Sequence, residues 1–207
     1  MSEARIGRVL VASLHQAIGD VLPTRLEFYE NWLNPSGLRE GTIGLAPLMA
    51  VISFLRTEGD DPYVAVTTRA GEYAAEWTVR ALPRLEHWLI GALPVPIRPR
   101  ATLRTVRMLV RATYPGTRAI ISWRRGVATV DLRGSLFCEV REASHVPLCG
   151  FYAAATARVL TLLDLRATVH VVECRAAGGR RGCVLKVSVD RSPPVVPAGE
   201  GEAPVTP

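Results

Sequence analysis

The chain has 207 residues, of which 48% are hydrophobic and 21% are charged, so it is long enough for one ordinary domain and is not wholly disordered. Its formal net charge is +6, and Lys186 is the only lysine among 25 basic residues; this arginine bias does not name a function. The sequence contains no run of about 18 apolar residues, so we expect no transmembrane helix. The first apolar run, residues 6–22, lacks the cleavage site of a secretory signal. We therefore expect a cytoplasmic protein with reduced thiols.

The first half of the chain has helical periodicity. Apolar residues recur every three or four positions and predict helices over residues 8–21, 26–33, 45–55, 63–82, 85–93 and 101–112. The 45–55 segment is apolar on nearly every face, which indicates a buried helix. Ala70, Ala74 and Ala75 give the 63–82 helix a face of small residues.

The second half alternates strands with one helix. We predict a hairpin of strands 119–123 and 127–132, with the second strand running on through Phe137 to residue 140. A helix over 147–163 and a second hairpin, 168–174 with 183–189, follow. This order predicts an α+β fold, with a helical N-terminal half and an antiparallel sheet of about four strands. Residues 1–190 are expected to form a single domain, and the proline-rich residues 191–207 a disordered tail.

The four cysteines all lie in the second half of the chain. If Cys174 faces Cys183 in the last hairpin, then Val172 faces Leu185 and His170 faces position 187, all on the inward side of the sheet. The C-x8-C spacing is not a standard zinc knuckle. The pairing nevertheless places two thiols side by side.

Two further cysteines could complete a metal site. Cys149 lies in the first turn of its helix, where the helix dipole favours a thiolate, and Cys138 ends the preceding strand. Four such ligands would suit a structural zinc ion, with His145 and His170 as substitutes. Buried reduced thiols, or a disulfide between Cys174 and Cys183, remain alternatives.

The segments 146–155, 169–174 and 178–187 carry a resemblance to a known family. They resemble the 4-vinyl reductase domain, with a Pro-x-Cys helix start at Pro147, a strand ending at Cys174, a glycine-containing turn and a second cysteine at Cys183. That family is similar in fold to the TRAPP vesicle-tethering subunits and to the sensing domain of bacterial activators that respond to aromatic compounds. The resemblance therefore implies a TRAPP-like fold and a homodimer.

In those sensors three cysteines and a glutamate hold zinc beside an apolar pocket. The resemblance therefore implies Cys149, Cys174 and Cys183 as zinc ligands. The glutamate position holds Val171 here, so that either Cys138 replaces the glutamate or the site is empty.

An apolar pocket is expected beside the cysteines. Leu148, Tyr152, Ala155 and Val159 form a second apolar stripe on the 147–163 helix, and Phe137 and Phe151 lie near it in the sequence. These residues are candidates for binding a hydrophobic small molecule. The alternative is that they form ordinary core packing.

Residues 87–130 contain no acidic side chain and eight arginines. Arg100, Arg104, Arg107 and Arg111 form one stripe of a helix, which indicates an acidic partner or an anionic membrane surface. The alternative is a solvated face that pairs with carboxylates such as Glu27, Glu30 and Glu86. No motif supports nucleic-acid binding.

Three functional hypotheses follow. The sequence has no nucleophile elbow, phosphate-binding loop, zinc-protease motif or dinucleotide fingerprint, so we expect no catalysis. The first hypothesis is a module that binds or senses a hydrophobic ligand and holds a zinc ion. The alternatives are an enzyme or accessory factor of tetrapyrrole metabolism, of the bacteriochlorophyll type, and a TRAPP-like interaction scaffold.

Overall fold

The computed structural model describes residues 6–33, 44–139, 143–179 and 182–190. The helices are α1 (Arg8–Val21), α2 (Leu26–Leu33), α4 (Leu45–Thr57), α5 (Asp60–Arg80), α6 (Arg84–Ala92), α7 (Arg98–Thr113) and α8 (Gly150–Leu162). The strands are β1 (Arg118–Arg124), β2 (Val127–Arg133), β3 (Ala167–Glu173) and β4 (Cys183–Val189). Short 3₁₀ helices cover Pro23–Arg25, Leu136–Cys138 and Arg175–Ala177. The expected α+β fold is confirmed, whereas the predicted disordered tail lies outside the described residues.

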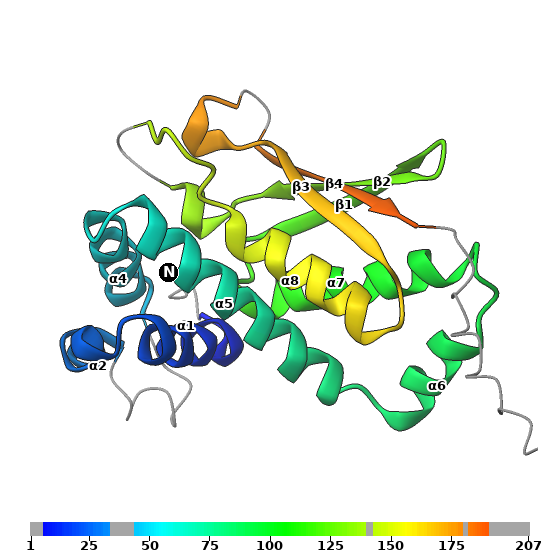
Figure 1. Ribbon diagram of the computed structural model, residues 1–207, viewed down its shortest axis with the longest axis horizontal. Coiled ribbons are helices and arrows are strands. Elements are labelled where there is room, and N and C mark those ends of the chain that lie inside the picture. Colours follow the sequence, from blue (N-terminus) through cyan, green and yellow to red (C-terminus); the bar gives the residue numbers. More distant parts are fainter. Residues whose placement is uncertain (1–5, 34–43, 140–142, 180–181, 191–207) are drawn as a thin grey trace, which may run out of the picture.

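The strands form one antiparallel sheet in the order β1-β2-β4-β3. Helices α7 and α8 lie against one face of this sheet, and α5 and α1 form a further layer behind them (Figure 1). Helices α2 and α4 lie at one end of the molecule and α6 lies at the other (Figure 1). No helix in the described ranges has the length and apolar character needed to cross a bilayer.

The contact between α5 and α8 depends on a glycine. A Cβ on Gly71 would lie 2.3 Å from the carbonyl oxygen of Phe151, so the two helices approach one another more closely than alanine allows. Ala70, Ala74 and Ala75 of α5 are also buried, as the small-residue face of the sequence predicts.

The first hairpin forms as predicted, but Arg124, expected in the turn, pairs with Val127 at the end of β1. Arg125 and Gly126 both have positive φ, 49° and 83°, which is the geometry of a two-residue type I′ turn. The predicted continuation of β2 through Phe137 is wrong, because the chain leaves the sheet at Gly134. Gly134 has φ 71°, and a Cβ there would lie 2.5 Å from the carbonyl oxygen of Gly116.

The second hairpin differs from the expected register by one residue. Val171, rather than Val172, pairs with Leu185, and His170 pairs with Lys186, so both His170 and Val172 face solvent. A β-bulge then shifts the register between Val171 and Glu173. The extra residue turns the strand, and Cys174 returns to the interior beside β4.

Candidate metal and ligand site

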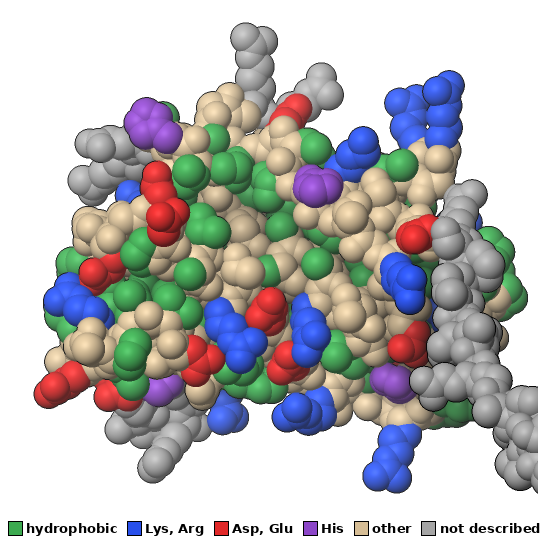
Figure 2. Space-filling model, in the orientation of Figure 1, with side chains coloured by type: hydrophobic (Ala, Val, Ile, Leu, Met, Phe, Trp, Pro, Cys, Tyr) green, Lys and Arg blue, Asp and Glu red, His purple; other side chains and the backbone are tan. Residues whose placement is uncertain are grey.

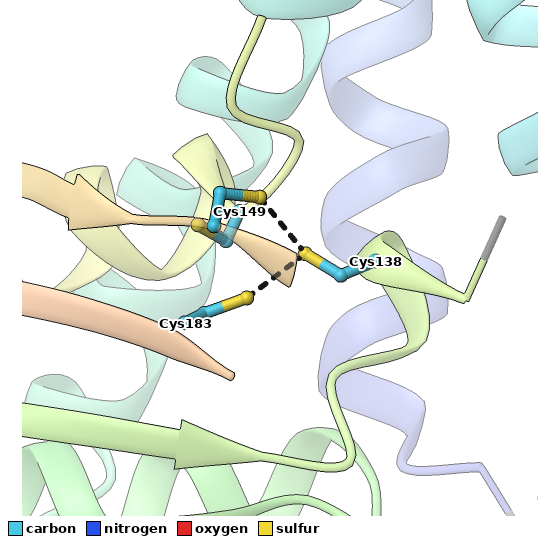
Figure 3. A group of neighbouring side chains, drawn as sticks. Cys138, Cys149 and Cys183 are labelled. Atoms are coloured by element: carbon cyan, nitrogen blue, oxygen red, sulfur yellow. Dashed lines mark hydrogen bonds between the residues drawn. The ribbon is translucent and has the colours of Figure 1, made fainter. Parts of the chain in front are cut away.

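The four cysteines meet at one end of the sheet. Cys138 ends a 3₁₀ helix, Cys149 is the N-cap of α8, Cys174 follows β3 and Cys183 begins β4. All four side chains are buried, and their sulfur atoms lie within 4.8 Å of one another. Figure 3 shows Cys138, Cys149 and Cys183 converging from three separate elements. The sequence-based grouping of these residues is therefore confirmed, although Cys138 lies on a helical turn rather than a strand.

The sulfur spacings exclude disulfides and suit a single metal ion. Cys138 Sγ lies 3.1 Å from Cys183 Sγ and 3.5 Å from Cys174 Sγ, whereas a disulfide bond is about 2.0 Å long. All four thiols are free. Zn–S bonds near 2.3 Å place the sulfurs of a tetrahedral site about 3.8 Å apart. The donor set is therefore that of a closed site with four thiolate ligands.

The thiols strongly influence one another's protonation. Hydrogen bonding with Cys138 and with the other two sulfurs, followed by burial, raises the pKa of Cys149. Hydrogen bonding of Cys174 with Cys138, and then with the other two sulfurs, lowers the pKa of Cys174. Four thiolates packed this closely would repel one another strongly, so a divalent cation is the natural partner of the fully ionised cluster.

Backbone contacts hold the cysteine loops in place. Tyr63 Oη donates to the carbonyl of Leu148 over 3.0 Å and so connects α5 to the residue before Cys149. The carbonyl of Cys174 accepts the amide hydrogens of Ala177 and Gly179, at 3.0 Å and 2.8 Å. Sequence reasoning missed Tyr63, because nothing in the chain relates it to a loop 85 residues away.

The proposed substitute ligands do not join the cluster. His145 and His170 are exposed, and Glu173 is exposed on the outer side of β3. Val171 is half-buried within the strand, so the position of the family's glutamate supplies no ligand. Cys138 provides the fourth donor instead.

A cavity reaches the cluster from solvent. It has a volume of about 240 Å³ and is lined by Cys138 and Cys183 together with Ser135, Arg133 and Arg175. A metal ion therefore has a short path to two of the four sulfurs.

The six predicted ligand-binding residues lie in the core. Phe137, Leu148, Phe151, Tyr152, Ala155 and Val159 are all buried. Phe137 stacks on Phe151 with ring centroids 5.0 Å apart, and Tyr152 meets Phe151 edge-on at 5.1 Å. The Tyr152 hydroxyl lies 3.4 Å from Thr117 Oγ1 and 3.5 Å from Thr113 Oγ1. These side chains pack on one another directly beside the cysteines, and a ligand among them remains a prediction.

No family model and no curated protein matches the sequence. Among solved structures, an unliganded Fe(II) H-NOX protein from K. algicida, carrying one substitution, is similar with a TM-score of 0.56. The two sequences are 12% identical, and the match covers 89% of this chain and 97% of that chain. The chain has an H-NOX-like fold.

Two further H-NOX structures are similar at lower scores. A doubly substituted Tt H-NOX protein has a TM-score of 0.42 and 14% identity, covering 95% of this chain and 100% of that chain. An oxygen-binding H-NOX domain related to soluble guanylate cyclases, in its oxygen complex, has a TM-score of 0.38 and 14% identity, covering 89% and 93%. None of the three is described as a 4-vinyl reductase domain, so that assignment stays a proposal.

Proposed function

We propose that this chain is a non-catalytic ligand-binding or sensory module whose H-NOX-like fold is stabilised by one zinc ion on Cys138, Cys149, Cys174 and Cys183. The observation that carries the zinc site is the placement of four buried sulfurs within 4.8 Å of one another. Thiolate sulfur is the donor that structural zinc prefers, and four protein ligands leave no open position for substrate. The ion would therefore act structurally rather than catalytically.

The zinc ion would connect parts of the chain that local structure does not connect. The cluster joins the turn after β2, the start of α8 and the facing ends of β3 and β4. Phe137 directly precedes Cys138 on its 3₁₀ turn, and Phe151 follows Cys149 by two residues on α8, so the two stacked rings lie on the elements that carry two of the sulfurs. A ligand that entered this part of the core would therefore be apolar and would lie beside the metal.

Iron held by imidazole does not fit this chain. The similar K. algicida protein is described with Fe(II). Here His15 contacts Glu30 at the surface, and His87, His145 and His170 are exposed. None of the four histidines is in the core, so thiolate is the donor that the interior offers.

Metal analysis of the purified full-length chain tests the zinc site. We expect about one zinc ion per chain and little iron. Cobalt substitution should give the intense charge-transfer and ligand-field absorption of a tetrahedral thiolate site. Less than about 0.2 zinc per chain, with no cobalt uptake by the reduced protein, would reject the metal centre.

The ligand-binding part needs a separate test. Native mass spectrometry of freshly purified protein should show a mass excess beyond zinc that organic extraction removes. Titration with a porphyrin then distinguishes the tetrapyrrole alternative, because a bound porphyrin shifts its absorption band. A protein that carries only zinc, and binds neither aromatic compounds nor porphyrin, would leave the metal centre intact but reject the sensory role.

A further inference from the structure

Helix α6 presents its apolar side to solvent. Leu85, Trp88 and Leu89 lie on one helical stripe and are 66%, 65% and 49% exposed. Ile90 is the single buried residue of this helix. A surface helix normally turns its apolar stripe toward the core, so this reversed orientation requires an explanation outside the domain.

The exposed apolar surface continues past the helix. Val95 and Ile97, in the connection to α7, are 59% and 50% exposed. Val95 also lines a cavity of about 210 Å³ with Pro99, Trp123 and Gly126, which places the β1–β2 turn beside this connection. The apolar stripe of α6 and the tip of the first hairpin therefore belong to one end of the molecule (Figure 1).

Arginines border this apolar surface. The Arg98 guanidinium donates to the carbonyl of Gly91 at the end of α6, and Arg100 lies over the ring of Trp123 at 5.9 Å. Arg124 and Arg125 are exposed at the hairpin tip, where basic side chains gather in Figure 2. Arg84 is exposed in the first turn of α6.

Arg98, Arg100, Arg124 and Arg125 lie in the segment 87–130, which contains no acidic residue, whereas Arg84 lies two positions before Glu86 on α6. The ion pairs within the described ranges lie elsewhere, for example between Arg69 and Asp20 and between Arg158 and Glu76. Figure 2 shows this balance over α5, where basic and acidic side chains lie next to one another. Carboxylates at the end of the molecule that carries α6 are Glu86, on the helix itself, and Asp164 and Asp190, which line the neighbouring cavities. Five arginines against these three carboxylates give this end an excess of positive charge beside its apolar stripe.

We propose that this end of the molecule, the α6 face, binds the surface of an anionic lipid bilayer. The α6 face consists of the apolar residues Leu85, Trp88, Leu89, Val95 and Ile97 and the bordering residues Arg84, Arg98, Arg100, Arg124 and Arg125. The apolar stripe inserts among the headgroups, and the guanidinium groups contact lipid phosphates. A tryptophan on the inserted stripe suits the polar–apolar boundary of a bilayer.

Charge favours this occupant over two others. A nucleic acid would neutralise the arginines but would leave the exposed leucine and tryptophan side chains in water. A second copy of the chain, docked through the same face, would bring two sets of arginines together. An anionic bilayer satisfies both the apolar stripe and the positive border.

Flotation of the full chain with vesicles tests the proposal. We expect binding to phosphatidylcholine vesicles that contain phosphatidylglycerol at about one lipid in three. Binding to phosphatidylcholine alone should be at least about tenfold weaker, because arginines near an anionic surface each add to the attraction. Raising the salt concentration should weaken binding. Trp88→Ala and Leu89→Ser should each reduce it about tenfold, and Arg100→Gln roughly fivefold.

Trp32→Ala provides the matched control. Trp32 is 40% exposed on α2, at the opposite end of the molecule, so its replacement should leave vesicle binding unchanged. Circular dichroism melts of each variant establish that it is folded. Absence of binding by the native chain, equal binding to both lipid compositions, or equal losses for Trp32→Ala and Trp88→Ala would overturn the proposal. A concentration-dependent dimer that Trp88→Ala abolishes would instead assign the face to a second copy.

Discussion

The sulfur of Cys138 lies 3.1 Å from the sulfur of Cys183, although the two residues are 45 positions apart and belong to different elements. Cys138 closes a 3₁₀ helix after β2, and Cys183 opens the strand that pairs with β2. A metal ion at this point would therefore join the 3₁₀ helix that follows β2 to the first residue of β4.

Removing the metal should destabilise the fold. Zinc present at about 1,000 times its dissociation constant contributes about 4 kcal/mol to the free energy of unfolding. For a chain of this size, stripping it with a chelator should lower Tm by roughly 8–16 °C. Cys183→Ser and Cys149→Ser should each lose zinc and melt near the temperature of the stripped protein. Melting at the native temperature by any zinc-free variant would contradict a structural role.

Zinc affinity should fall as the pH falls. The metal-bound form needs thiolates, so zinc holds the pKa of each ligand below its value in the unfolded chain. The stabilisation is then present above the unfolded thiol pKa, near 8.5, and declines as protons compete at lower pH. Hydrogen bonding with Cys138 raises the pKa of Cys149 in the metal-free cluster, so the Cys149 thiol keeps its proton there. Zinc must displace this proton when it binds.

Competition with a chelator of known affinity at several pH values measures this dependence. We expect the apparent dissociation constant to rise about tenfold or more for each pH unit below 7, because at least one proton is exchanged per zinc ion. An affinity that does not change with pH would mean that the ion is held by groups other than the thiols.

Gly71→Ala should disrupt the contact between α5 and α8. The added Cβ would lie 2.3 Å from the Phe151 carbonyl oxygen, so the helices must move apart, at a cost of about 3 kcal/mol. Gly91→Ala is the control, because nothing lies within 4 Å of its Cβ position and alanine is favoured in a helix by about 1 kcal/mol. Urea unfolding should show a large loss for the first variant and none for the second.

Tyr63→Phe should weaken the loop that carries Cys149. The substitution leaves the buried carbonyl of Leu148 without its donor, which costs about 1–3 kcal/mol. Loosening a ligand's support should also lower zinc affinity, by up to about tenfold. Tyr73→Phe removes an exposed contact with Asp20, so chelator competition with this variant should match the native protein.

Local periodicity predicted most of the fold. The helices 8–21 and 26–33 and the strand 183–189 have the predicted bounds, because their apolar spacing and their flanking residues agree. The errors fall where tertiary contacts decide the backbone. Gly134 leaves the sheet early because of its close approach to Gly116, and α8 begins at Gly150 rather than at Pro147.

The cysteine cluster was predictable as a group but not in its geometry. Burial and the hairpin placed Cys174 beside Cys183, whereas no local signal indicated that Cys138 lies on a helical turn. The bulge after Val171 was also hidden, since strand alternation alone assigns one face to every second residue. Similarly, the exposed stripe of α6 has the same period as a buried one, so the sequence could not show which way it faces.

The extra residue in β3 lets the cysteine cluster tolerate a change in chain length. Deleting Val172 would restore plain alternation, with Val171 still opposite Leu185 and Glu173 still opposite Val184, so the side chain after Glu173 would still point inward. A thiol-specific reagent should therefore spare that cysteine in the folded deletion variant and in the native protein alike. Descendants of this chain that lose the Val172 codon would keep all four thiols together.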